Sequence, residues 1–339
     1  MKPSFLALRL GETEVWVPTY GVAVTLGIFT AIVLAARQAP AQGFERNRVV
    51  DLCFGLLVAG LLGARLAFVG LHAGQFAQRC FGGEGQGEGR SLGGALADCL
   101  APLRIWDGGL VFYGGALAAA GWAYFFARRR SWSFAKVGDL FAPGLALGHA
   151  VGRLGCFGVG CCFGKACLLG HPPGVAFPPG SVAYQHLRAF GQVKAQAAHT
   201  GPLHPTQLYE SAALLALFFL LLWWMPRRRR HGQVFLVYLV GYAVLRFVLE
   251  MFRGDANRRF VMEVTSAALA RSLWLPPEEP LFLSIAQAVS LGLLALAGAL
   301  AWTIARGSRR VRQAGTPPLA PEDATQGERH FATGGKNQP

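Results

Sequence analysis

Apolar stretches of about 20 residues recur along the chain, and each can cross the roughly 30 Å hydrocarbon layer of a bilayer as one helix. Backbone groups inside lipid must bond to one another, so a helix is the structure that such a stretch favours there. Seven stretches are expected to span the membrane: Trp16–Ala36, Val50–Ala73, Gly109–Ala127, Val137–Gly158, Thr206–Met225, Val234–Phe252 and Leu281–Ala305. The sequence therefore predicts an all-α polytopic membrane protein.

The composition agrees with this class. Hydrophobic residues make up 53% of the chain and charged residues only 15%, which is too apolar for an ordinary soluble domain. The formal net charge of +14 comes mostly from arginines in loops beside apolar stretches, and not from one basic face of a soluble domain. We therefore expect membrane lipid as a partner, and no nucleic acid.

Clusters of basic residues alternate along the chain with connections that carry less clustered charge, and such clusters mark cytoplasmic loops. They follow the first, third, fifth and last expected spans, and comprise Arg37, Arg46, Arg48, Arg128–Arg130, Lys136, Arg227–Arg230, Arg306, Arg309, Arg310 and Arg312. This pattern puts the N-terminus and the connections 74–104 and 165–203 outside. A membrane domain is expected over residues 1–312, and a disordered cytoplasmic tail over 313–339.

Several polar side chains inside these spans come to one depth in the outer half of the membrane, counting 1.5 Å of rise per residue. They are Tyr20, Arg65, Tyr113, Arg153, Glu210, Arg246 and Glu250. Charges are costly in a bilayer, so residues on separate helices that share a depth indicate a common cavity and a functional site. Asp51 and Asp139 instead lie at inner helix starts, where a carboxylate favours the positive helix end, and are assigned to capping.

Two stretches place ionisable groups at helical spacing. Arg246 and Glu250 are four residues apart and Glu250 and Arg253 three, so one helix face can carry all three. An ion-pair ladder that makes the charges tolerable in lipid is one interpretation, and the deeper Arg246 favours a ligand. His204 lies at the start of another span, where a capping or hydrogen-bonding role and a chemical role both stay open, while Glu210 follows just over a turn inward.

Four motifs together resemble those of the bacterial prolipoprotein diacylglyceryl transferase family. In chain order they are Trp106-Asp-Gly-Gly-Leu-Val-Phe-Tyr-Gly-Gly115, Gly152-Arg-Leu-Gly-Cys-Phe157, His204-Pro-Thr-Gln-Leu-Tyr-Glu210 and Leu245-Arg-Phe-Val-Leu-Glu250. The resemblance implies an enzyme of the bacterial inner membrane that moves a diacylglyceryl group from phosphatidylglycerol to the lipobox cysteine thiol of prolipoproteins. A thioether forms and glycerol phosphate is released, and no cofactor is implied.

The resemblance also implies roles for residues. Arg246 is the first catalytic candidate, oriented by Glu250, and Arg153 would hold the anionic leaving group with it. The catalytic set is expected to comprise Arg246, Arg153, Glu210, Tyr113 and Glu250. The substrate-binding set is expected to comprise Tyr20, Arg153, Arg246, Arg65, His204 and Arg253.

Two positions depart from the family pattern. Tyr113 stands where the family often has histidine, and Cys156 where asparagine often follows Gly-Arg-Leu-Gly. Tyrosine is a poor base near neutral pH, so the group that deprotonates the thiol stays open among Glu210, His149 and His204; plain helix packing is the default interpretation of His149. A divergent paralogue and a non-catalytic lipid-binding protein are alternatives. A transporter for an anionic solute is disfavoured, because the polar residues mostly stop in the outer half.

Six of the seven cysteines fall toward the outer side, which is a compartment that permits disulfides. Cys80 and Cys99 bracket an outer loop, and a second group comprises Cys156, Cys161, Cys162 and Cys167. The spacing of this group fits no standard zinc pattern, so we expect no metal ion. Adjacent cysteines rarely bridge each other, which makes Cys156 or Cys167 the better disulfide partners, and a redox function is a minor interpretation.

Overall fold

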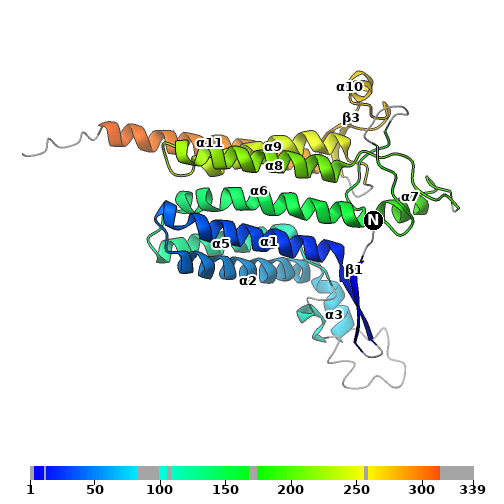
Figure 1. Ribbon diagram of the computed structural model, residues 1–339, viewed down its shortest axis with the longest axis horizontal. Helices are drawn as coiled ribbons and strands as arrows, with labels where there is room; N and C mark the ends of the chain where they lie inside the picture. The colour runs from blue at the N-terminus through cyan, green and yellow to red at the C-terminus, as the bar shows by residue number, and fades with distance from the viewer. Residues whose placement is uncertain are drawn as a thin grey trace, which may run out of the picture.

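The computed structural model describes residues 4–10, 13–81, 99–104, 108–167, 174–194, 196–255 and 259–313. Long helices lie side by side as a bundle and make up most of this part of the chain (Figure 1). They are α1 (Thr19–Gln38), α2 (Arg46–Leu71), α5 (Phe112–Arg129), α6 (Phe134–Val159), α8 (Thr206–Trp224), α9 (Gln233–Phe252) and α11 (Ile285–Gln313). The all-helical membrane fold expected from the sequence is thus confirmed.

The seven expected spans each coincide with one of these helices, and their ends agree within four residues except at the C-terminal end of α11. Six of the helices are long and apolar enough to cross a membrane. The exception is α5, which has 18 residues and carries Arg128 and Arg129 in its last turn. The protein is therefore a multi-pass membrane protein, while the count of seven spans and the direction of the termini stay predictions.

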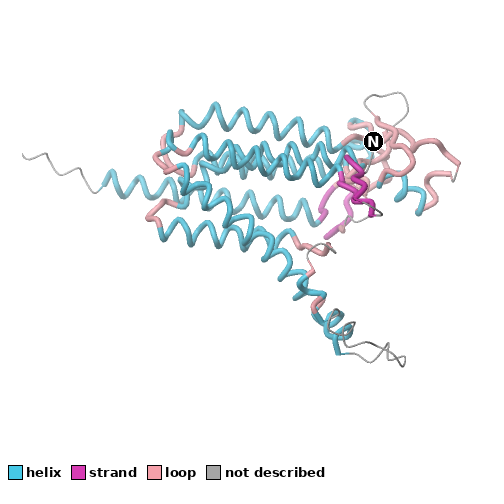
Figure 2. The backbone as a smooth tube through the Cα atoms, turned by 60° about the horizontal axis from the view of Figure 1, so that its bottom comes forward, coloured by secondary structure: helices cyan, strands magenta, loops and turns pink. Residues whose placement is uncertain are grey.

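Helix α6 lies in the middle of the bundle, with α1 packed on one side and α8 on the other, while α2 pairs with α5 and α9 with α11 (Figures 1 and 2). Small residues allow the closest of these approaches. A Cβ atom on Gly27 of α1 would lie 2.6 Å from the carbonyl oxygen of Gly148 on α6. Glycine at this crossing lets the two backbones meet, as membrane helices often require.

The shorter elements lie mostly at one end of the bundle (Figure 1). Two antiparallel pairs join β1 (Ser4–Leu10) to β2 (Thr13–Pro18) and β3 (Phe260–Val264) to β4 (Phe282–Ser284). The helices at this end are α3 (Ala73–Phe81), η2 (Ala101–Leu103), α7 (Val182–Ala189) and α10 (Ala267–Ser272), and the turns η1 (Pro40–Gln42) and η4 (Met225–Arg227) lie at the opposite end. Cys80 of α3 forms a disulfide with Cys99. The tail expected at 313–339 lies outside the described residues except for Gln313, which is the last residue of α11.

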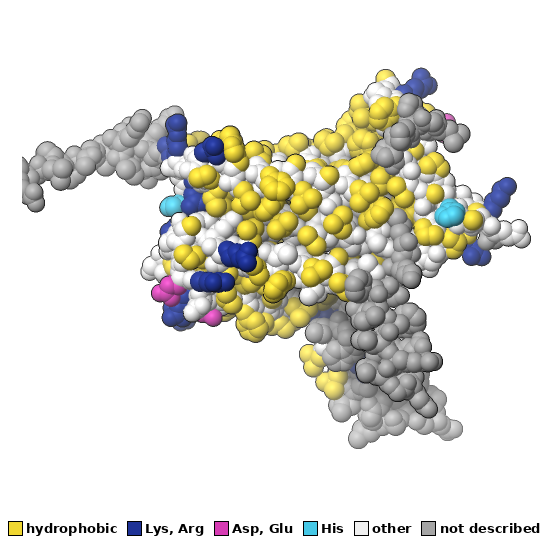
Figure 3. Space-filling model, viewed as in Figure 1, with side chains coloured by type: hydrophobic (Ala, Val, Ile, Leu, Met, Phe, Trp, Pro, Cys, Tyr) yellow, Lys and Arg dark blue, Asp and Glu magenta, His cyan; other side chains and the backbone are white. Residues whose placement is uncertain are grey.

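The surface of the bundle is that of a protein in lipid. Large apolar side chains stand exposed along the helices, including Phe54 and Leu66 of α2, Leu117 of α5 and Phe219 of α8. Figure 3 shows hydrophobic side chains over the side of the bundle, with lysine and arginine gathered mainly toward one end. In water such a surface would be an aggregation hazard, whereas in a bilayer it faces the acyl chains.

Asp139 fastens the end of the bundle opposite the disulfide. It is fully buried in α6, and its two carboxylate oxygens accept hydrogen bonds from the backbone N–H groups of Gly232 and Phe235, at 2.7 and 2.9 Å. Arg228 lies 3.7 Å away. The expected capping role is correct, but the helix that Asp139 caps is α9 and not its own. Asp51 is exposed and pairs with Arg48 at 3.8 Å.

Candidate active site

Glu210 and Arg153 form an ion pair between two neighbouring helices. Glu210 lies one turn into α8, and Arg153 lies one and a half turns before the end of α6. The distance from Arg153 Nη2 to Glu210 Oε1 is 3.0 Å, and both side chains are largely buried. The buried hydroxyl of Ser211 donates to the carbonyl of Ala150 and ties α8 to α6 beside this pair. A buried carboxylate needs a partner of opposite charge, and Arg153 supplies it to Glu210.

His149 adds a neutral base to this pair. Arg153 Nε donates to His149 Nε2 at 3.3 Å, and the same nitrogen lies 3.5 Å from Glu210 Oε1. The two contacts conflict, because an Nε2 that accepts from arginine has no proton to give to the carboxylate. The bond from Arg153 is the shorter and has hydrogen-bond geometry, so the imidazole is the tautomer with its proton on Nδ1. The lone pair on Nε2 of this neutral imidazole thus accepts from Arg153.

A second group of charges lies on and after α9. Arg246 Nη2 lies 2.7 Å from Glu250 Oε2, and Glu250 is almost fully buried. Arg253 lies 3.9 Å from Glu250 and also donates two hydrogen bonds to the carboxylate of Asp255. Burial opposes the charge of Arg253, yet the hydrogen bonds and charge of Asp255 raise its pKa. Glu250 is thus closer to Arg246 than to Arg253. The row of ion pairs predicted from spacing continues from Arg253 to Asp255.

Tyr242 lies between the two groups, and we did not predict it from the sequence. Its ring centre is 5.5 Å from that of His149, and it interacts electrostatically with Glu210, Arg246 and Arg153. It precedes Arg246 by four residues, which puts both on one face of α9. That spacing is the signal that could have found it. The predicted Tyr113 also interacts with Tyr242, from the start of α5, and is 60% exposed.

Polar atoms without a partner face this region. Nη1 of Arg246 and Oε1 of Gln207 are buried and have no hydrogen-bond partner among the described residues. Oε1 of Glu210 makes its contacts by distance alone, without hydrogen-bond angles. Buried polar groups of this kind are rare in a finished core, since each costs about 1–3 kcal/mol. Unpaired atoms also occur elsewhere in the described part of the bundle, at Gln38, Trp122 and Trp224. Those of Arg246, Gln207 and Glu210 are distinguished by the charged groups beside them, which are typical of a site that binds a polar ligand.

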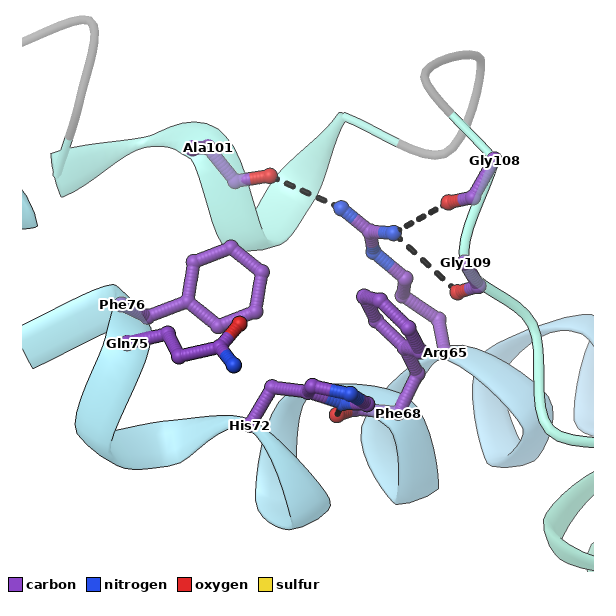
Figure 4. A pocket seen from close by; sticks show the side chains of 8 residues that line it. All are labelled: Arg65, Phe68, His72, Gln75, Phe76, Ala101, Gly108 and Gly109. Atoms are coloured by element: carbon purple, nitrogen blue, oxygen red, sulfur yellow. Dashed lines mark hydrogen bonds between the residues drawn. The ribbon is translucent and has the colours of Figure 1, made fainter.

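Arg65 lies apart from these ion pairs. Its guanidinium donates to the carbonyls of Gly108, Gly109 and Ala101 (Figure 4). It also donates to the carbonyl of Pro102, and all four acceptors come from the segment before α5. It lines a cavity of about 180 Å³, and none of the side chains that line this cavity belongs to the two ion pairs. The cavity is a weaker candidate for the active site than the ion pairs, because the guanidinium of Arg65 already has four carbonyl acceptors. Trp106 and Asp107 of the adjoining motif lie outside the described residues.

His204 and Tyr20 lie at the starts of α8 and α1, near the end of the bundle that holds the ion pairs. His204 is buried, and its ring nitrogens lie 3.3 Å from the Tyr209 hydroxyl and 3.4 Å from the Trp274 carbonyl. Burial lowers the pKa of His204. Its contacts join α8 to the segment after α10, which favours the hydrogen-bonding interpretation. Tyr20, at the start of α1, is half exposed and passes close to Gly155 of α6.

Three cysteine sulfurs meet where α6 ends. Helix α6 stops at Gly160, whose left-handed backbone (φ +78°) turns the chain back, so that Gly160 N and Cys161 N donate to the Cys156 carbonyl. The sulfurs of Cys156, Cys161 and Cys162 all lie within 4.8 Å of one another. Hydrogen bonds with the other two thiols, and the charges of Arg253 and Arg153, lower the pKa of Cys162. Cys167 is not a member of this group.

Lys165 is another residue that sequence reasoning missed. It is 2% exposed, and its Nζ donates to the carbonyl of Pro280 at 2.9 Å and pairs with Glu279 at 3.4 Å. Lys165 N also donates to the carbonyl of Phe252. It therefore fastens the segment after the cysteines to the end of α9. A single lysine in a loop gives no sequence signal for such burial.

Comparison with known proteins identifies relatives over most of the chain. The sequence model of the family described as prolipoprotein diacylglyceryl transferase matches residues 6–303. Three relatives carry the name phosphatidylglycerol–prolipoprotein diacylglyceryl transferase. That of Clostridium tetani is 28% identical over 73% of this chain and 85% of its own length. Those of Geobacillus kaustophilus and Bacillus cereus are 29% and 28% identical, over 79% and 86% of this chain and 90% and 88% of theirs.

Proposed function

The chain belongs to the prolipoprotein diacylglyceryl transferase family, and we propose that it transfers the diacylglyceryl group of phosphatidylglycerol to a cysteine thiol of a prolipoprotein. The thiol sulfur attacks the glycerol carbon that carries the phosphate ester. A C–S bond forms, the C–O bond breaks, and glycerol phosphate leaves with the electron pair. The partners are thus phosphatidylglycerol and the lipobox segment of prolipoprotein signal peptides.

The observation that carries this proposal is the buried guanidinium of Arg246. Glu250 holds its Nη2 at 2.7 Å, while Nη1 has no hydrogen-bond partner among the described residues. A guanidinium keeps its charge and matches the geometry of a phosphate oxygen. In a water-poor cavity it stabilises the charge that develops as the phosphate leaves. Arg246 is therefore the catalytic arginine, and Glu250 orients it.

Arg153 is the second phosphate ligand, and Glu210 fixes its direction across the bundle. The carboxylate faces Arg153 and His149 and no backbone N–H among the described residues. The proton of the incoming thiol needs an acceptor, and Nε2 of His149 would take it once Arg153 turns from His149 to the phosphate. Glu210 and His149 together are our candidates for the base, with Tyr113 and Tyr242 beside them.

The remaining predicted residues border the substrate. Tyr20 is half exposed at the end of the site and would contact the glycerol phosphate or the peptide. Arg253 contributes positive charge and also donates two hydrogen bonds to the Asp255 carboxylate. His204 and Arg65 would support the substrate site through the segments that they fasten.

We assign the protein to the bacterial inner membrane, with the site in its outer half. Two observations support this direction. Cys80 and Cys99 form a disulfide at the end of the bundle that holds the candidate site, and disulfides persist in an oxidising compartment. The arginines of α5 and of the turn before α9 lie at the opposite end, where the positive-inside rule expects the cytoplasm.

A mass-spectrometric assay tests the function. Purified protein in detergent is mixed with phosphatidylglycerol and a reporter peptide that carries a lipobox cysteine. We expect the peptide to gain a diacylglyceryl mass with the unchanged chain and with Arg128→Ala, an exposed arginine at the end of α5. Arg246→Ala should slow the gain by at least about 100-fold. No gain from well-folded unchanged protein would overturn the proposal in favour of a divergent paralogue.

A further inference from the structure

The sulfurs of Cys156, Cys161 and Cys162 form a cluster that the proposed reaction does not yet use. Sequence spacing predicts no metal site here, but spacing does not register the left-handed turn at Gly160, which returns two cysteines onto the third. Mutual distances within 4.8 Å are close to what a metal requires. Sulfurs bound at about 2.3 Å around a tetrahedral zinc ion stand about 3.8 Å apart. Movements of about 1 Å would therefore close the site.

The backbone around the cluster is already held in place. Thr206 Oγ1 donates to the carbonyl of Cys162 at 2.7 Å, and Gln207 Nε2 donates to that of Cys161 at 2.6 Å. Both donors are buried in the first turn of α8, the same helix that carries Glu210. Cys162 also has a positive φ of 57°, which is a costly conformation for a residue other than glycine. Such conformations persist where surrounding contacts impose them, often at functional sites.

The surroundings suit thiolates. Arg153 precedes Cys156 by three residues, about 4.5 Å along the helix axis and on the same face. Arg253 forms a backbone bridge with Gly164, two residues after Cys162. Three thiolates around a divalent ion leave a net negative charge, which these arginines stabilise. Thiolate ligands select soft ions such as Zn²⁺ over Mg²⁺ or Ca²⁺.

We propose that Cys156, Cys161 and Cys162 bind a zinc-type metal ion whose open fourth position takes the substrate thiol. In the part of the chain that the structure describes, no further histidine, cysteine or carboxylate joins the group. Three protein ligands with an open position are typical of catalytic zinc sites, whereas structural sites have four. Cys161 and Cys162 are partly exposed, so an external ligand can reach the ion.

This inference rests on the proposed transferase function and supplies its thiolate. A thiol that coordinates a divalent ion is deprotonated near neutral pH. Its proton passes to water or to the His149 and Glu210 pair, and its sulfur then displaces glycerol phosphate as described above. The metal is neither oxidised nor reduced. Such a site would make a base at the Tyr113 position unnecessary.

Metal binding is tested first, by a measurement that does not depend on transferase activity. The full-length protein is purified with reductant, stripped with a chelator, and dialysed against Zn²⁺ or Co²⁺ alone. We expect one ion per chain by elemental analysis, and with Co²⁺ the intense absorption of tetrahedral thiolate coordination. Cys156→Ser, Cys161→Ser and Cys162→Ser should each weaken binding by at least about tenfold. Cys167→Ser is the matched control, since this nearby buried cysteine lies outside the group.

Two results would overturn the site. One is the absence of a retained ion in reduced protein that elutes as a single folded species. The other is a disulfide between two of the three cysteines in protein isolated from membranes without reductant. Cys156 is buried, so its serine variant is at risk of misfolding. The metal affinity of Cys162→Ser is therefore the deciding measurement, because Cys162 is partly exposed.

The thiol ligand is tested by adding a lipobox peptide to the Co²⁺ form. The cysteine peptide should change the thiolate absorption, whereas the same peptide with serine should not; an unchanged spectrum would exclude the open position as the thiol site. The transfer assay separates the two proposals. Transfer at full rate by metal-free protein would refute the role of the metal in the reaction and leave the transferase function intact. Metal and peptide binding without transfer would refute the function and leave the metal site.

Discussion

Glu210 and Asp139 are both buried carboxylates in the helix bundle, and each has an arginine beside it, but their surroundings differ. Asp139 accepts hydrogen bonds from two backbone N–H groups at the start of α9. Glu210 accepts from no backbone N–H in the described part of the chain, and its nearest partners are the side chains of Arg153 and His149. A carboxylate bonded to the main chain fixes a helix. One that faces other ionisable side chains orients an arginine or accepts a proton.

The same contrast separates two arginines. Within the described residues, the hydrogen bonds of Arg65 all go to backbone carbonyls of one connection. Arg246 instead pairs with Glu250 through one nitrogen, while its other terminal nitrogen has no partner among the described residues. Burial alone therefore does not distinguish a structural charge from a functional one. The partner does, because main-chain partners are fixed and ligands are not.

The largest expected effect separates the two carboxylates by activity. Glu210→Gln should slow diacylglyceryl transfer by at least about 100-fold, equivalent to about 2.7 kcal/mol of activation free energy. The amide keeps the shape of the side chain but loses the charge that fixes Arg153. The rate is measured by the mass gain of the reporter peptide. A rate that falls only with the yield of folded protein would make Glu210 structural, like Asp139.

The next effect is on stability and belongs to Asp139. Asp139→Ala should lower the free energy of unfolding by about 2 kcal/mol, because α9 loses its cap and Arg228 loses a partner. Thermal unfolding in detergent measures it, with Asp139→Asn as the variant that keeps an acceptor and should lose less. The transfer rate per folded molecule should not change. A lower transfer rate per folded molecule in Asp139→Ala would show that Asp139, like Glu210, contributes to the reaction.

A smaller effect is expected at Arg65. Arg65→Ala should destabilise the protein by about 1 kcal/mol, since the four carbonyls sit beside a cavity where water can replace the guanidinium. If Arg65 only fastens the segment before α5, the KM for phosphatidylglycerol stays constant. A raised KM with unchanged thermal stability would instead support the substrate-binding role predicted from the sequence.

The smallest effect is a pH dependence at His204. Burial lowers its pKa, so the unfolded chain takes up the proton first as the pH falls. Stability from the neutral imidazole is therefore complete above its unfolded pKa of about 6.5 and declines as the pH falls toward the folded pKa. Melting temperatures between pH 8 and 5 should decline less steeply in His204→Gln than in the unchanged chain. His231→Gln, at an exposed position in the opposite loop, should keep the original slope.

Much of the fold follows from the sequence alone. Apolar length fixed the positions of the helices, because a bilayer requires about 20 residues per crossing and offers the backbone no other partner. The weakest case was α5, where two arginines shorten the apolar part. The ionisable residues at one depth were also predictable, since charges in lipid must cluster or pair. For this reason the contact of Arg246 with Glu250 was expected before the structure, as was a shared depth for Glu210 and Arg153, although not their direct contact.

Only the tertiary structure decided which partner each charge meets. Spacing predicted that Arg253 would pair with Glu250, and the two lie 3.9 Å apart, but the chain after α9 also brings Asp255 to Arg253. Spacing also argued against a metal at the cysteines, whereas one left-handed turn gathers three sulfurs. Hydrophobic pattern acts locally and is written in consecutive residues. The partner of a buried charge depends on which helices pack together and where each chain reversal directs the next side chain, and no single stretch of sequence records that.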